Sequence, residues 1–117
     1  MGLDTYASRS PGDRVLTAED EQAFEDASIE LCGGMFSDDD GAFRGKVYAP
    51  VVLDVTGVSL FQEWIPPAVV SEMASALQSC DPKETARSGD IVPEELKALT
   101  RFFRLCAERG LGLVGWW

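Results

Sequence analysis

The chain has 117 residues, 45% of them apolar, which is enough for one folded domain with its own core, and we predict a single domain over 1–117. Its net charge of −10 repels nucleic-acid phosphates and anionic lipid, so nucleic acid and membrane are excluded as partners. The N-terminus lacks the basic start and apolar stretch of a signal peptide, so we expect a cytoplasmic protein.

The negative charge is concentrated in the first part of the chain. Residues 1–45 hold 11 acidic and 3 basic side chains, whereas residues 46–117 hold 9 and 7. Carboxylates in this number favour solubility, which is the commoner reason for such a composition. The alternative interpretation is a protein partner with a basic surface, which the acidic residues of 17–40 would attract.

The first elements are a strand and a helix. Residues 3–7 contain good strand formers and predict a short strand. Thr17 has the position and side chain of a helix N-cap, and Asp20 follows three residues later as in a capping box. The helix should cover about 18–28 and lie on the surface, because its apolar stripe is thin.

The next segment predicts a hairpin-like unit and a second short helix. We expect residues 29–48 to form the hairpin, with its second strand at 43–48. Residues 50–56 are ambiguous between strand and helix, because they contain several β-branched side chains. Pro50 in a first helical turn and Gly57 after the last turn favour the helix.

The second half of the chain predicts two long amphipathic helices. Residues 58–65 should be extended and half-buried, and helices should cover 67–79 and 93–109. Residues 111–117 should form a closing strand. The predicted fold class is therefore α+β: a two-layer arrangement in which the two helices pack on one face of a small, mostly antiparallel sheet. The expected core positions of the two helices are Val69, Val70, Met73, Ala76, Leu77, Cys80, Leu96, Leu99, Phe103 and Cys106.

Several common chemistries have no residues to carry them. The chain contains no histidine, which excludes serine or cysteine triads and zinc motifs with histidine ligands. It has neither of the usual glycine-rich phosphate loops and no C-x-x-C motif. We therefore predict no catalytic residue, no metal and no cofactor, and we lean towards a protein that is not an enzyme.

Two groups of residues are candidates for binding. Asp38, Asp39 and Asp40 form an acidic turn that resembles a cation site only loosely, because consecutive carboxylates point in different directions. Phe61 and Trp64 precede a rigid Pro-Pro corner, and an aromatic ledge of this kind suits a ligand or a peptide. Their alternative role is to anchor the following helix. Trp117 is a further candidate, because alternation in the last strand turns one of its two tryptophans outward.

A second set of candidates surrounds a cysteine. Gly33 and Gly34 would let a ligand approach the backbone, with the Cys32 thiol beside it. This arrangement would suit a small-molecule or metal-binding domain, or an enzyme that uses carboxylates and a thiol. Lys97, Arg101 and Arg104 form a basic stripe on the last helix, and we expect them to pair with the acidic first half of the chain.

Parts of the chain resemble known bacterial sequences. The opening MGLDTYA, with LCGGMFS (31–37), FRGKVY (43–48) and QEWIPP (62–67), resembles bacterial and phage-associated proteins of unknown function that begin MGLDTY or MGLDMY. This resemblance implies no activity and no functional residue. The stretch LKALTRFFRLCAERGLGLV (96–114) is similar to small bacterial immunity-type domains, which end in an amphipathic helix and a strand.

Three functional hypotheses follow. The first is a non-enzymatic protein-interaction domain of the inhibitor, immunity or accessory type, whose acidic residues attract a basic partner and whose Trp64 or Trp117 anchors it. The second is the small-molecule or metal-binding domain. The third is a homodimer that forms through the edge of the last strand.

Overall fold

The computed structural model describes residues 3–11, 15–27, 29, 42–81, 83–84 and 91–116, and all structural statements concern these residues. Seven of the candidate residues lie outside the described residues, and the predictions for them stay predictions. They are Cys32, Gly33, Gly34, Asp38, Asp39, Asp40 and Trp117.

The described strands form one antiparallel sheet of three strands in the order β2-β1-β3. The central strand β1 covers Asp4–Ser8, and its neighbours are β2, Ala42–Arg44, and β3, Gly112–Trp116. Strands from the two ends of the chain therefore pair directly. The first and last predicted strands are confirmed, with boundaries that differ by about one residue.

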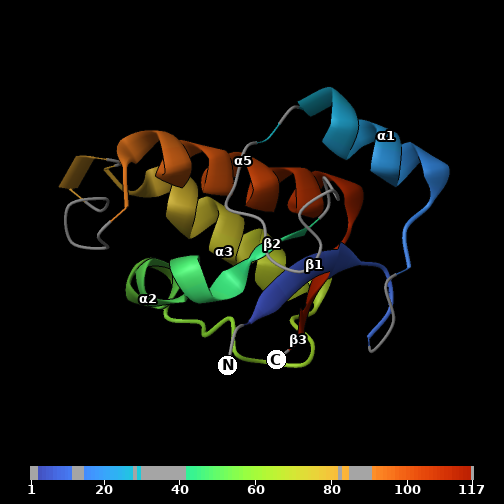
Figure 1. Cartoon of the computed structure of the whole chain (residues 1–117), viewed down its shortest axis with the longest axis horizontal. Coiled ribbons are helices and arrows are strands. Elements are labelled where there is room, and N and C mark those ends of the chain that lie inside the picture. The colour runs from blue at the N-terminus through green and yellow to red at the C-terminus, as the bar shows by residue number, and fades with distance from the viewer. Residues whose placement is uncertain are drawn as a thin grey trace.

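The helices with described bounds are α1 (Ala18–Ala27), α2 (Gly45–Thr56), α3 (Pro67–Ser79) and α5 (Pro93–Arg109). The two long helices α3 and α5 have the predicted boundaries, and they pack against each other more extensively than any other pair of elements. Figure 1 shows α3 and α5 side by side, with α1 on the outer side of α5. The predicted α+β class is confirmed.

Aromatic rings from both layers meet in the core. Phe43 of β2 packs edge to face on Phe102 of α5, with ring centroids 4.9 Å apart. Tyr48 of α2 also packs edge to face with Phe43, with ring centroids 5.7 Å apart. Phe103 is fully buried beside them. Since these rings come from three elements, they fix how α2 and α5 lie against the sheet.

The prediction of a strand over 43–48 is wrong beyond Arg44. The strand ends there, and α2 begins at Gly45 and continues to Thr56. The buried side chains Tyr48, Val51 and Val52 recur with helical spacing, so burial of one helix face overrides the strand preference of β-branched residues. The helix predicted over 50–56 is confirmed, but it starts earlier, and Pro50 lies inside it.

Residues 58–65, which were predicted to be extended and half-buried, form no regular strand. The segment is irregular and joins the sheet only at Ile65, which exchanges two backbone hydrogen bonds with Leu113 of β3, at 2.8 and 2.9 Å. It lies very close to β3, because a Cβ at Gly112 would stand 2.4 Å from the Trp64 ring. Glycine in β3 therefore makes the room that this segment occupies.

Candidate functional site

The beginning of α1 is built as a capping box. The Thr17 hydroxyl accepts a hydrogen bond from the Asp20 backbone N–H at 3.1 Å, and the Asp20 carboxylate accepts one from the Thr17 N–H at 3.0 Å. Each residue thus satisfies a backbone donor that the helix itself leaves unpaired. The predicted N-cap is confirmed, and so is the partner three residues later.

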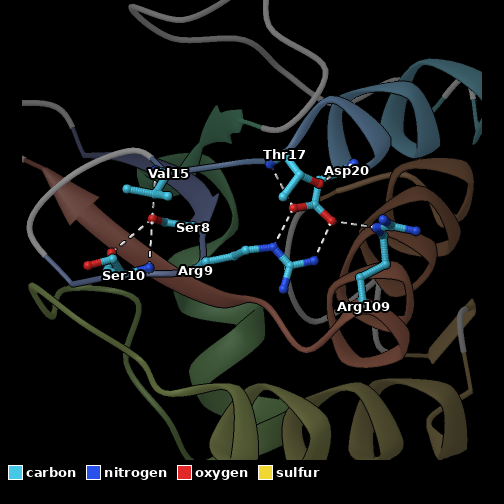
Figure 2. A network of polar contacts seen from close by, with 7 residues as sticks. All are labelled: Ser8, Arg9, Ser10, Val15, Thr17, Asp20 and Arg109. Atoms are coloured by element: carbon cyan, nitrogen blue, oxygen red, sulfur yellow. Dashed lines mark hydrogen bonds and ion pairs between the residues drawn. The ribbon is translucent and has the colours of Figure 1, made fainter.

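The same Asp20 carboxylate is the centre of a buried ionic cluster. Arg9 donates to its two oxygens from Nε and Nη2, at 2.6 and 2.7 Å, and Arg109 donates from Nε at 2.6 Å. Asp20 is fully buried, whereas both arginines keep part of their surface in water. We call Asp20, Arg9, Arg109 and Thr17 the Asp20 cluster, which Figure 2 shows.

The cluster strongly favours the ionised carboxylate. The hydrogen bonds from Arg9 lower the pKa of Asp20 well below its ordinary value, and those from Thr17 and Arg109 lower it further. Burial acts in the opposite direction and is outweighed. Asp20 therefore keeps its negative charge throughout the physiological pH range. Its role in the fold is to join the end of β1, the start of α1 and the end of α5.

The loop after β1 brings Arg9 to this place. The buried Ser8 hydroxyl donates to the Ser10 carbonyl at 2.8 Å and accepts from the backbone N–H groups of Ser10 and Val15 (Figure 2). The Arg9 N–H donates to the Val15 carbonyl at 2.8 Å. These bonds turn the described ends of the loop back on one another. Arg9 and the first turn of α1 consequently lie next to each other.

Two further contacts hold α1 against α5. The Phe24 ring is buried against Phe102, with ring centroids 5.1 Å apart. At the other end of α1, the Arg101 guanidinium donates a short hydrogen bond to the Ala27 carbonyl. The start of α1 thus lies near the end of α5, and the two helices are antiparallel. A cation at the last turn of α1 also interacts favourably with its dipole.

The opposite face of α1 carries exposed carboxylates. We define this acidic face as Glu19, Glu21, Glu25 and Asp26, which are all exposed, on a helix that contains no lysine or arginine. Gln22 donates to Asp26 at 2.8 Å along the helix. The acidic residues of this helix thus divide into one buried carboxylate that organises the fold and four that face solvent.

The aromatic candidates lie elsewhere. Phe61 is 45% exposed, whereas Trp64 is half-buried with its ring against Gly112. Trp64 therefore packs on β3, and its predicted roles in binding and in anchoring the following helix stay predictions. Figure 1 places α1 and the segment 58–65 on opposite sides of the molecule. One compact partner surface cannot include both the acidic face and Phe61.

The residues of the basic stripe on α5 were predicted to pair with the acidic first half of the chain, and Arg101 does contact that half. Arg104 is bound to Glu108 on its own helix, at 3.2 Å, and Arg101 reaches a backbone carbonyl of α1. At Asp20 the ion pairs come instead from Arg9 and Arg109. Sequence reasoning missed both arginines. Arg109 ends a predicted helix and Arg9 follows a predicted strand by two residues, but nothing in the sequence indicates that these two places meet at Asp20.

The described cysteines belong to the packing of α3 and α5. Cys106 is fully buried as predicted, and burial raises the pKa of its thiol, with a smaller contribution from the negative charge of Asp20. Cys80 is half-buried, and its thiol lies 3.0 Å from the Leu77 carbonyl. A thiol held in its neutral form is a poor nucleophile, so Cys106 is a structural residue.

The buried polar atom Thr5 Oγ1 finds no hydrogen-bond partner in the described part of the chain. It lies against Gly45 at the start of α2, where a Cβ would come within 2.1 Å of it. The hydroxyl is thus enclosed by packed backbone rather than directed into an open site.

Two other kinds of site are absent from the described residues. No three acidic, cysteine or histidine side chains there are grouped as metal ligands would be. None of the helices described is both long and apolar enough to cross a membrane. No family model, curated protein or solved structure was found to match the chain.

Proposed function

We propose that this protein is a non-enzymatic interaction domain that binds a protein partner with a basic surface through the acidic face of α1. The observation that carries the proposal is the division of carboxylates on α1. Asp20 is buried and neutralised by two arginines, whereas Glu19, Glu21 and Asp26 are exposed on a helix without basic side chains. A fixed helix with one sign of charge attracts an oppositely charged surface.

The attachment of α1 supports this role. The Asp20 cluster, Phe24 and Arg101 all hold the inner face of the helix, so the outer face keeps one orientation relative to the core. Carboxylates in a fixed arrangement lose less conformational freedom on binding than carboxylates on a free chain. The inhibitor, immunity or accessory type of function, which the sequence suggests, belongs to this same proposal.

The test compares how much partner is captured by the wild-type protein and by a variant whose acidic face is neutralised. The variant Glu19→Gln/Glu21→Gln/Asp26→Asn removes three charges from the acidic face and leaves Asp20 in place. Immobilised wild-type protein should retain a basic protein from host lysate at low salt and release it as salt rises. The triple variant should retain at least roughly tenfold less, because each removed charge weakens the attraction.

A matched control carries the same change in net charge elsewhere. Asp54, Glu63 and Glu72 are exposed and lie outside α1. The variant Asp54→Asn/Glu63→Gln/Glu72→Gln should capture the partner as well as the wild-type protein does. Equal losses in both variants would show an effect of overall charge alone, and undiminished capture by the first variant would contradict the proposal.

The homodimer hypothesis has a specific obstacle in the fold. On the edge of β3 that does not pair with β1, Leu113 is already paired with Ile65 of the same chain through two backbone hydrogen bonds. A second copy could not pair with that part of the strand unless the segment before α3 moved away. We therefore favour the interaction-domain hypothesis over the homodimer hypothesis.

A further inference from the structure

The attachment of α1 to the rest of the molecule is narrow. Of its ten residues, only Asp20 and Phe24 are buried, whereas α5 buries six residues, five of which pack within the main core cluster. The main packing partner of α1 among the described elements is α5. Local stability follows the amount of buried apolar contact, so α1 has much less to hold it than its neighbour has.

Release of α1 would leave the other elements supported. Phe102 would still pack on Phe43 and Phe103, and α3 would still cover α5. Arg9 and Arg109 already have 38% and 28% of their side-chain surface in water, so hydration can replace their bonds to Asp20. Release would break the bonds of the Asp20 cluster, the packing of the Phe24 ring and the Arg101 bond. Among the described residues that flank α1, Leu16 and Ile29 pack against the core but are only partly buried.

We propose that α1 is a hinged cover that opens as a unit from α5, exposing the Phe102 ring, while the sheet, α2, α3 and α5 remain folded. The opening is a property of the free protein and goes beyond the proposed function. Partner binding and opening are measured separately, so the failure of either proposal leaves the other standing.

Native-state hydrogen exchange of the full chain tests the cover with the variant Met73→Ala. Met73 is buried in α3 and belongs to the core that stays folded when α1 opens. The substitution should speed exchange at amides of β1 and α5 at least roughly tenfold, because those exchange by global unfolding. Amides of residues 22–27 should keep their wild-type rate, because their opening does not expose Met73.

The variant Phe24→Ala gives the complementary result. It removes the one large apolar contact of α1, so amides of residues 22–27 should exchange at least roughly tenfold faster. Small additions of denaturant to the wild-type protein serve as a check without substitution. They should accelerate exchange in β1 and α5 but hardly in α1, since its opening exposes little surface.

The proposal is overturned if α1 behaves as part of the global unit. In that case Met73→Ala would accelerate exchange at residues 22–27 by the same factor as in α5. Denaturant would likewise accelerate exchange in both helices together.

Discussion

The helices α5 and α1 lie side by side, but different forces hold them. Six residues of α5 are buried, among them Leu99, Phe102 and Phe103. α1 has one large buried apolar side chain, Phe24, and depends on the ionic cluster of Asp20. The difference teaches that one chain can build a core by apolar burial and attach an acidic helix to it by charge.

The largest expected loss of stability comes from a change in the apolar core that holds α5. The variant Phe103→Ala removes a fully buried ring that packs near Phe43 and Phe102. It should lower the free energy of unfolding by about 4 kcal/mol, measured by denaturant titration. Leu53→Ala, at a side chain that is 50% exposed, serves as the control and should cost much less. Similar losses in both variants would contradict the described core.

The next effect lies on the charged side. The variant Asp20→Asn keeps the shape of the side chain but removes the charge that binds Arg9 and Arg109. The free energy of unfolding should fall by about 2–3 kcal/mol, less than for a fully enclosed ion pair because the arginines reach water. Asp26→Asn, on the exposed face of the same helix, should change it by less than about 0.5 kcal/mol.

Lowering the pH should weaken the contribution of Asp20 to stability. The pKa of Asp20 is lower in the folded protein than in the unfolded chain, where it is near 3.8. The stabilisation by the ionised carboxylate is therefore fully present above that value and is lost as the pH falls below it. The difference in unfolding free energy between wild type and Asp20→Asn should shrink between about pH 5 and pH 2. A difference that stays constant would contradict the role of the charge.

A smaller effect tests the close contact behind β3. In the variant Gly112→Ala, the new Cβ would meet the Trp64 ring at 2.4 Å and the Ile65 carbonyl oxygen at 2.6 Å. We expect a loss of about 2 kcal/mol, because overpacking displaces the segment before α3. Tryptophan emission should shift to longer wavelength as Trp64 gains contact with water. An unchanged spectrum and stability would show that the segment does not lie on β3.

The smallest effect concerns a backbone angle. Gly110 ends α5 with a φ of 70°, and a Cβ at this position would meet no other atom within 4 Å. The variant Gly110→Ala should therefore cost about 1 kcal/mol, through the left-handed conformation alone. Its unfolding free energy by denaturant titration should lie between those of Gly112→Ala and the wild type. A loss larger than that of Gly112→Ala would contradict this ranking.

The same contrast explains how much could be predicted from sequence. The helices 67–79 and 93–109 were predicted to the residue, because apolar side chains recur at helical spacing between proline starts and glycine or proline stops. The Thr17 and Asp20 pair was predicted as a cap for the same reason, since it is local. The strand over 43–48 was wrong because Tyr48 has a strand preference that burial on α2 overrides.

The charged contacts could not be predicted in this way. Asp20 is 11 residues from Arg9 and 89 residues from Arg109, and no periodicity connects positions so far apart. The basic stripe on α5 was expected to pair with the acidic first half of the chain. Which arginine binds Asp20 depends on the distance between the two side chains in the folded protein, and the sequence does not give that distance. The contact between Gly112 and Trp64 likewise appears only once β3 and the segment before α3 are placed together.

The most direct test of the central claim is hydrogen exchange of the chain bound to its captured basic partner, compared with the free chain. Binding through the acidic face predicts slower exchange at backbone amides of residues 19–27, with little change in segment 58–65. Slower exchange at 58–65, around Phe61, with α1 unaffected, would place recognition on the opposite side of the molecule and contradict the account.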